Sequence, residues 1–216
     1  MRRESHVRFC EGGGVRFPSA TRLVMGFQHR EDAEKLRTEL REQLGKVKLE
    51  LHPDKTRLIE FGRFARKARA QRGQGRPETF DFLGFTHACG TTRGGKFKVL
   101  RTTARKKLGP KLQAVKVELK ARMHDSIPKT GKWLGTVVRG HVQYYGVPGN
   151  SEAIRTFRDQ AARYWFHALR RRSQRRPITW KRMQRHVKFW LPPARITQPY
   201  PDQRLRVTTR GRSPVR

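Results

Sequence analysis

The sequence predicts an α+β fold class, in which a small β-hairpin region is followed by a mainly α-helical module. Strand-like alternation of apolar and polar residues is confined to the first 103 residues, and apolar residues recur at helical spacing over most of the remainder. The chain of 216 residues is long enough for one or two domains. Hydrophobic residues make up only 35% of it, but 12 Phe and 4 Trp are enough for a modest core.

The first part of the chain is expected to contain a helix and a hairpin. Residues 1–22 show no periodicity and include a run of glycines, so we expect an irregular segment there. Apolar residues then fall on one face over 32–44, which predicts an amphipathic helix that ends at Gly45. Alternation over 47–51 and again over 56–61, with turn-forming residues between them, predicts a β-hairpin packed under this helix.

Two basic segments are expected to lack regular structure. Residues 63–76 carry many arginines and little apolar area, which predicts an exposed basic loop. Residues 201–216 are expected to form a basic disordered tail. Between these segments, apolar alternation over 77–103 around a Gly94–Gly95 turn predicts a second hairpin.

Helical spacing and capping residues divide the region 104–200 into successive helices. The first of them has one continuous apolar face. A second runs from about Thr130 to a stop at Gly146. Asn150 and Thr179 stand where N-caps are needed, which predicts a third and a fourth helix directly after them.

The charge of the chain indicates the chemical class of its partner. Because 51 Lys and Arg stand against 17 Asp and Glu, the formal net charge is +34, and a polyanion is the expected partner. Residues 1–100 hold 22 basic and 12 acidic residues, whereas residues 101–190 hold 23 basic and 4 acidic ones. The binding surface is therefore expected mainly in the second half.

Membrane and secretory classes are disfavoured. No apolar run approaches the roughly 20 residues that a membrane span requires, and the N-terminal segment lacks the apolar stretch of a signal peptide. Cys10 and Cys89 have neither metal-ligand spacing nor the pattern of a disulfide framework. The sequence therefore predicts a cytoplasmic protein with no membrane partner.

Basic residues, in places beside aromatic ones, are the candidate nucleic-acid contacts. Arginines crowd residues 170–176 at the end of the third predicted helix; the helix dipole accounts for one or two of them, whereas phosphate binding accounts for all. Tyr144 could stack on unpaired bases, while Tyr145 fits the core better. The candidate RNA-binding residues are Lys55, Arg57, Lys96, Lys98, Arg139, Tyr144, Arg170, Arg171, Arg172, Arg175, Arg176, Lys181, Arg182 and Arg185.

No catalytic or metal-ligating constellation is visible. His52, His87 and His141 have no carboxylate or nucleophile at useful spacing, so a structural or RNA-contact role is expected for each. Asp54, Glu60 and Asp81 are acids scattered along the sequence. We therefore expect no catalytic residue, no metal site and no cofactor in this chain.

Several stretches stand in an order that is specific to one protein family. The stretches that resemble the last palm blocks of group II intron reverse transcriptases are Leu49–Gly62 (LELHPDKTRLIEFG) and Phe80–His87 (FDFLGFTH). Those that are similar to the maturase-specific, or X, domain of the same proteins are Gly140–Asn150 (GHVQYYGVPGN), Ala168–Gln174 (ALRRRSQ) and Trp180. The resemblance covers about residues 23–201.

The resemblance implies a role for each part of the chain. Residues 23–62 would be the remnant of a palm, 77–103 a primer-grip-like hairpin and 104–200 the helical thumb and maturase-specific domain. The primer-grip-like residues are Phe82, Leu83, Gly84 and Phe85. The implied ligand is group II intron RNA, whose folding and splicing the chain would assist. DNA and a complementary reverse transcriptase fragment are further candidate partners.

The same resemblance implies that the chain lacks polymerase chemistry of its own. Two-metal catalysis requires clustered carboxylates, and the positions aligned with the family's Tyr-Ala-Asp-Asp turn hold Ser19, Ala20, Thr21 and Arg22. Mg²⁺ is expected only for the complete family enzyme. We therefore expect a truncated or frameshifted remnant that is inactive alone. Two alternatives stay open: a polymerase part activated by a complementary chain that supplies the fingers and catalytic palm, and a remnant with nonspecific affinity for polyanions.

Overall fold

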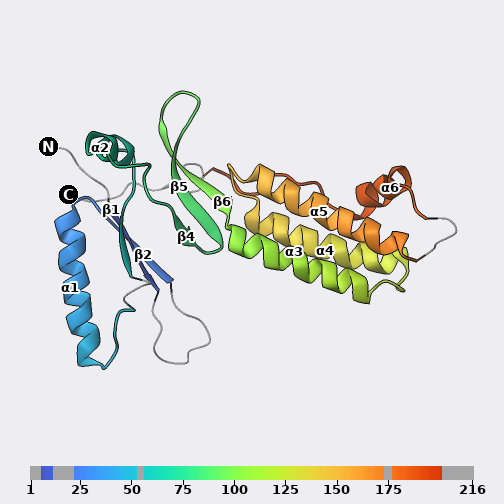
Figure 1. The fold of residues 1–216 in the computed structure, drawn as a ribbon, viewed down its shortest axis with the longest axis horizontal. Helices are drawn as coiled ribbons and strands as arrows, with labels where there is room; N and C mark the ends of the chain where they lie inside the picture. The colour runs from blue at the N-terminus through green and yellow to red at the C-terminus, as the bar shows by residue number, and fades with distance from the viewer. Residues whose placement is uncertain (1–5, 12–21, 53–55, 173–176, 201–216) are drawn as a thin grey trace, which may run out of the picture. The chain divides into compact units, whose positions relative to one another are not determined.

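The fold is α+β, as the sequence predicts. The computed structural model describes residues 6–11, 22–52, 56–172 and 177–200. It divides into two compact units, Met1–Leu100 and Arg101–Arg216, which we call the sheet unit and the helical unit (Figure 1). Within the described ranges, the sheet unit holds two three-stranded sheets and two helices, and the helical unit holds four helices.

The first sheet is built around an N-terminal strand. Its strands, in the order β2-β1-β3 with antiparallel pairing, are β1 (His6–Glu11), β2 (Arg22–Phe27) and β3 (Arg57–Glu60). Val7 at the centre lies opposite Gly26 of β2 and Ile59 of β3. The prediction of an irregular segment over 1–22 is therefore wrong for β1. Val7 and Phe9 do alternate with polar residues, but so short a run becomes a strand only where distant partners pair with it.

The predicted hairpin between 47–51 and 56–61 is also wrong. Of these two described segments, only the second contains a strand, and its partner is β1. Lys48 adopts a left-handed backbone conformation, with a φ of 57°. That conformation interrupts the extended chain that a strand over 47–51 would need.

The two helices of the sheet unit differ from the prediction in extent. Helix α1 (Arg30–Lys46) contacts β1 and β2 and buries Ala33; it continues one residue beyond Gly45, where we expected its end. The segment predicted as an exposed basic loop, 63–76, contains helix α2 (Ala65–Gln71). Alanine, arginine, lysine and glutamine all favour helix. Arg69 in the helix and Arg72 directly after it form ion pairs with glutamates outside the helix, which offsets the repulsion between like charges.

The second sheet contains the expected hairpin and one more. Its strands, in the order β4-β5-β6, are β4 (Phe80–Phe82), β5 (Phe85–Thr91) and β6 (Phe97–Thr103). The Gly94–Gly95 turn joins β5 to β6, as predicted. Leu83 and Gly84 form a two-residue turn between β4 and β5, with φ of 48° and 80°. Positive φ at both positions suits the twist of a tight hairpin. The primer-grip-like residues are therefore the tip of a hairpin.

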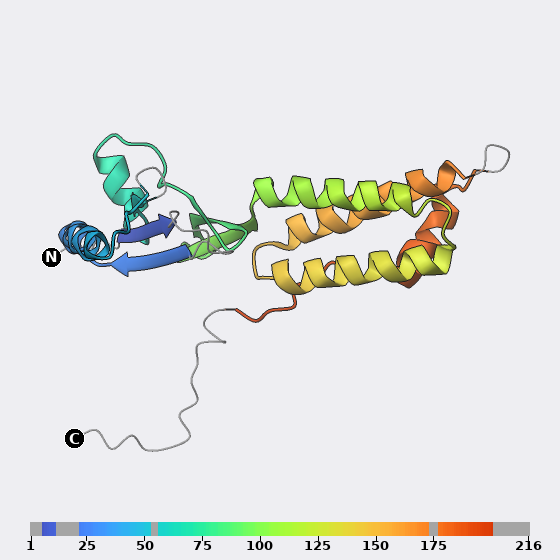
Figure 2. The same ribbon diagram turned by 90° about the horizontal axis from the view of Figure 1, so that it is seen from below.

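The helical unit packs around a central helix. Its helices are α3 (Arg105–Ala121), α4 (Ile127–Tyr145), α5 (Ser151–Arg170) and α6 (Trp180–Trp190). Helix α5 lies between α3 and α4 (Figure 2) and also contacts α6. Its Phe157 and Trp165 are fully buried, together with Leu119 of α3, Leu134 of α4 and Met183 of α6. The apolar faces that the sequence predicts for these helices are confirmed.

Capping residues set the helix starts, with two corrections. Thr179 caps α6 as predicted, because its side chain accepts a hydrogen bond from the Arg182 amide. Helix α4 begins earlier than Thr130, because the Ser126 side chain accepts from the Lys129 amide and starts the helix there. Asn150 precedes α5, but its side chain makes no capping hydrogen bond.

The side chain of Asn150 instead joins three backbone segments of the helical unit. Its Oδ1 accepts from the Thr103 amide at 2.9 Å, and its Nδ2 donates to the Thr103 hydroxyl and to the Tyr145 carbonyl, each at 2.8 Å. The residue is 1% exposed. A buried amide with all of these bonds satisfied fixes the end of β6, the end of α4 and the start of α5 against one another.

Replacing Asn150 with Ala should lower the free energy of unfolding of the helical unit by about 2 kcal/mol, because the buried Thr103 amide would lose its acceptor. Urea denaturation followed by tryptophan fluorescence measures this, since all four tryptophans lie in this unit. Ser151→Ala, at the exposed neighbouring position, is the control. Equal unfolding midpoints for the two variants would contradict the role of Asn150.

The segment after α6 closes the C-terminal end of α4. The Thr197 and Gln198 amides both donate to the Gly146 carbonyl, at 2.9 and 3.0 Å. The Thr197 hydroxyl donates to the Val142 carbonyl, and the Gln198 side chain donates to the Gln143 carbonyl. Carbonyls that a helix end leaves without partners are satisfied in this way.

Candidate nucleic-acid interface

The helical unit presents its positive charge outward. Three of the four acidic residues that the structure describes in this unit are held by cations of the same unit: Glu118 by Arg122, Asp125 by Arg122 and Lys129, and Asp159 by Arg158. Among its described residues, the exposed cations are Arg105, Lys106, Lys107, Lys111, Lys116, Lys120, Lys129, Lys132, Arg139, Arg155, Arg163, Arg170, Arg171, Lys181, Arg182, Arg185, Lys188 and Arg195. Acidic groups inside the unit can therefore neutralise only a small part of this charge.

The arginines at the end of α5 do not form a single surface. Arg170 and Arg171 are exposed, and the Arg170 guanidinium lies over the Phe166 ring, 5.6 Å from its centroid. Arg172 turns back instead: its Nη2 donates to the Arg122 carbonyl, and burial lowers the pKa of its guanidinium. Arg175 and Arg176 lie outside the described residues. Two of the predicted arginines are thus placed to meet a ligand.

Helix α6 carries a second group of predicted residues on one exposed side. Lys181, Arg182 and Arg185 are exposed, and so is Lys188, while Met183 and Val187 pack into the core from the opposite side. We call Lys181, Arg182, Arg185 and Lys188 the α6 basic face. Phe189 beside it is 77% exposed. This face combines cations with an accessible aromatic ring on a helix that the core holds rigidly.

The other predicted residues are more scattered. Arg139 and Tyr144 are exposed on α4, whereas Tyr145 is half-buried, in agreement with the expectation that Tyr145 faces the core. In the sheet unit, Lys96 in the β5–β6 turn and Lys98 on β6 are exposed, as predicted contacts must be. Lys55 is outside the described residues. Arg57 donates to the Glu78 carboxylate at 2.7 Å, so its charge is already engaged.

A groove between α3 and α5 was not expected from the sequence. It has a volume of about 610 Å³ and is lined by Gln113, Lys116, Val117, Lys120, Met123, Tyr164, His167, Ala168 and Arg171. We call it the α3–α5 groove. Lys116 and Lys120 of α3 line it together with Arg171, which directly follows α5, and none of its lining residues is acidic. The Lys116 ammonium lies over the Tyr164 ring, 5.7 Å from its centroid.

The groove residues follow helical spacing, which is the signal that could have found them. Lys116 and Lys120 are four residues apart on α3, and Tyr164 and Ala168 of α5 fall on one stripe with Arg171, the residue that follows α5. Tyr164 also follows the apolar spacing of the third predicted helix, which favours a core residue. The two lysines could not be assigned to a groove, because the sequence does not show that α3 and α5 are neighbours.

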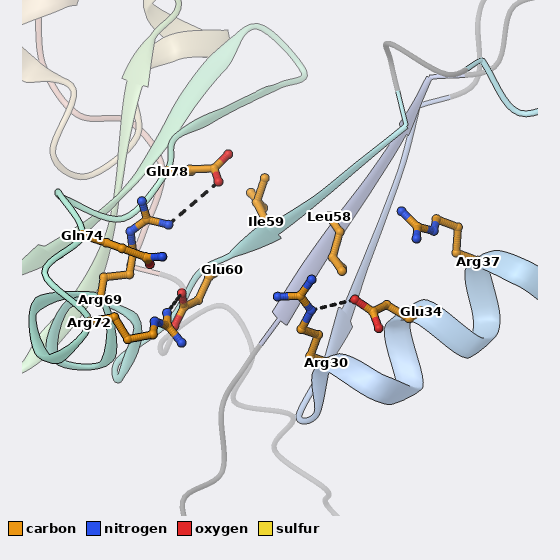
Figure 3. A pocket seen from close by; sticks show the side chains of 10 residues that line it. All are labelled: Arg30, Glu34, Arg37, Leu58, Ile59, Glu60, Arg69, Arg72, Gln74 and Glu78. Atoms are coloured by element: carbon orange, nitrogen blue, oxygen red, sulfur yellow. Dashed lines mark hydrogen bonds and ion pairs between the residues drawn. The ribbon is translucent and has the colours of Figure 1, made fainter.

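The sheet unit has a charged pocket of a different kind. Its volume is about 480 Å³, and Figure 3 shows Arg30 and Arg37 of α1 on one side, with Arg69 of α2 and Arg72 directly after α2 on the other. The glutamates that line it, in three different segments, are Glu34, Glu60 and Glu78. Arg30 pairs with Glu34, and Arg72 pairs with Glu60. Because the arginines face carboxylates inside the pocket, it concentrates little net charge and is a poor site for a polyanion.

His87, His141 and Cys89 have structural surroundings. His87 stacks on Phe80, and His141 is buried against Phe157. The Cys89 thiol contacts the backbone of Gly62, and burial raises its pKa. Within the described ranges, no three His, Cys, Asp or Glu side chains cluster as a metal ion would require.

Comparison with known proteins gives no family for the chain. No protein-family model matches the sequence, and no curated protein matches it. In the part of the chain that the structure describes, no helix is both long enough and apolar enough to cross a membrane. The function is therefore inferred from the residues, charges and geometry of the chain itself.

Proposed function

We propose that this chain is an RNA-binding protein of the maturase type, which binds group II intron-like RNA in the cytoplasm and assists its folding. The observation that carries the proposal is the outward charge of the helical unit: most of its described cations are exposed, while three of its four described acidic residues are paired internally. The motifs that resemble the maturase-specific domain fall in the same unit.

Lysine and arginine side chains on rigid helices suit a folded RNA. Each phosphate that they neutralise releases counterions, so binding is strong at low salt. This electrostatic part of the binding free energy does not depend on the RNA sequence. A folded RNA brings phosphates of separate strands close together, where they repel one another. A surface with cations on several helices lowers the repulsion between these phosphates. Arginines add bidentate phosphate contacts and can stack on bases. Compact RNA folds are therefore favoured over open ones.

Removing three charges from the α6 basic face tests the proposal. Changing Lys181, Arg182 and Arg185 to Ala should weaken binding of a group II intron RNA about tenfold or more at moderate salt, and should reduce the slope of log K against log salt by about 2 to 3. The measurement is competitive binding across a salt series, with size-matched unrelated RNA and duplex DNA as competitors. Tryptophan fluorescence verifies that the variant is folded.

The matched control removes three exposed charges from a helix of the sheet unit. Lys35, Arg41 and Lys46 of α1 are exposed, and their change to Ala should alter the affinity less than the α6 variant does, by about twofold at most. Equal losses in the two variants, or equal affinity for intron RNA, unrelated RNA and duplex DNA, would mean that only net charge matters. A maturase role would then be rejected.

A further inference from the structure

We infer that the α3–α5 groove is a binding slot for an unpaired RNA nucleotide, in which the base lies on Tyr164 and Val117 and the flanking phosphates meet Lys116, Lys120 and Arg171. The inference rests on the proposed function, because it takes RNA as the ligand. It adds a specific site to that function and a preference for single-stranded segments.

The floor of the groove has the chemistry that a base requires. Tyr164 packs against the core, so its ring is held in place, while Val117 is 59% exposed and offers an apolar surface beside it. Bases stack on aromatic side chains whatever their identity, because every base has a π face. A rigid ring next to an open apolar residue is therefore a stacking platform.

The rim of the groove has the chemistry that phosphates require. Lys116 and Lys120 come from α3 and Arg171 comes from the end of α5, so positive charge borders the groove on both helices. With no carboxylate among the lining residues, no internal group competes with a phosphate. His167 and Gln113 add polar groups that can form hydrogen bonds with a base edge or with the ribose.

Lys116 covers the Tyr164 ring while no ligand is bound. Its ammonium lies over the Tyr164 ring at 5.7 Å, an exposed cation–π contact on a flexible side chain. Such a contact is weaker than base stacking on an aromatic ring, so an incoming base displaces it. The freed ammonium then lies beside the nucleotide, where it can pair with a phosphate.

The size of the groove excludes a duplex. Its volume of about 610 Å³ lies within the roughly 300 to 1,000 Å³ of pockets that hold one small ligand. In a duplex the bases are paired and stacked on one another, so their faces cannot reach Tyr164. The groove therefore distinguishes unpaired from paired segments, whereas the α6 basic face meets phosphates of either kind.

The test compares a short oligoadenylate with the same strand annealed to oligouridylate. Val117→Glu fills the apolar floor and places a carboxylate beside the phosphates, and it should weaken oligoadenylate binding about tenfold while changing duplex binding about twofold or less. Val117 is largely exposed, so this change leaves the core intact. Ala114→Glu is the matched control, since Ala114 is exposed on the same helix and does not line the groove.

Tyr164 provides a second and independent readout. Tyr164→Ala should weaken oligoadenylate binding about tenfold or more with little change in its salt slope, because stacking releases no counterions. Tyr164→Phe keeps the ring and should bind nearly as the unchanged protein does. Tyr200→Ala, at an exposed tyrosine outside the groove, should have little effect.

The outcomes separate the groove from the proposed function. If Val117→Glu and Ala114→Glu bind oligoadenylate equally, or if Val117→Glu weakens single strand and duplex alike, the groove is not a nucleotide slot. The α6 triple variant tests intron RNA binding separately, through affinity and salt slope. The groove variants could lose oligoadenylate binding while the α6 triple variant binds intron RNA as the unchanged protein does. That result would support the nucleotide slot and reject the maturase role.

Discussion

Gly135→Ala is expected to lower the free energy of unfolding of the helical unit by about 2 to 3 kcal/mol. A Cβ at Gly135 would stand 2.5 Å from the backbone carbonyl oxygen of Trp190, which ends α6. One turn earlier, a Cβ at Gly131 would stand 2.6 Å from the Trp190 ring. The two glycines form a shallow channel on α4 in which Trp190 lies. The obstacle at Gly135 is backbone, so α6 must shift as a whole.

Gly140→Ala makes the same change on the same helix in open space. No atom lies within 4 Å of a Cβ at Gly140, and the residue is exposed. This variant should therefore raise the stability by about 0.5 to 1 kcal/mol, because alanine favours a helix over glycine. The opposite signs of the two changes isolate the close contact between α4 and α6 from the intrinsic effect of an added methyl group.

Urea denaturation followed by tryptophan fluorescence measures both variants. Trp133, Trp165, Trp180 and Trp190 all belong to the helical unit, so the signal reports that unit without the sheet unit. The m value should stay constant if only stability changes. A Gly135→Ala midpoint at or above that of the unchanged protein would contradict the close packing of α4 on α6.

The helical unit could largely be predicted because its signals are local. The apolar spacing of α3 to α6 and the cap at Thr179 depend on residues that are neighbours in sequence. The role of Asn150 depends on a residue that is distant in sequence. Its position predicts a cap, but its side chain bonds to Thr103, 47 residues away, and no local pattern reveals that partner.

The sheet unit was harder to predict because its pairing is not local. Strand β1 joins β2 and β3, and β3 follows it by many residues. The nearest alternating segment, 47–51, was the expected partner of β3, since short loops are the common case. For the site, the same limit applies: the exposed cations of α6 follow from helical spacing, whereas the α3–α5 groove requires knowing that two helices are adjacent.

The stability of the helical unit is expected to fall as the pH drops, because of His141. This side chain is 6% exposed, its ring stacks on Phe157 at 3.6 Å between centroids, and its Nε2 is buried with no hydrogen-bond partner among the described residues. Burial, with a smaller contribution from the positive charge of Lys111, lowers its pKa from 6.5 to about 4. The folded protein therefore holds this histidine neutral where an unfolded chain would protonate it.

The sign and the pH window follow from these two pKa values. Above about pH 6.5 the histidine is neutral in both the folded and the unfolded state, so its titration does not change the free energy of unfolding. Between about pH 6.5 and about pH 4 only the unfolded state binds the proton, so stability falls with decreasing pH, by about 3 kcal/mol in total. Below that range both states are protonated and the loss levels off.

A histidine that cannot titrate should remove this part of the pH dependence. His141→Phe keeps an aromatic ring against Phe157, and its stability should fall by about 3 kcal/mol less than that of the unchanged protein between about pH 7 and about pH 4. Urea denaturation at a series of pH values measures the difference in the free energy of unfolding between the variant and the unchanged protein. Titration of the carboxylates contributes equally to both proteins and cancels in this difference. His124→Gln, at an exposed histidine of the same unit, should keep the full dependence. Parallel curves for His141→Phe and the unchanged protein would mean that His141 is protonated inside the fold, and the stacked, neutral ring would have to be abandoned.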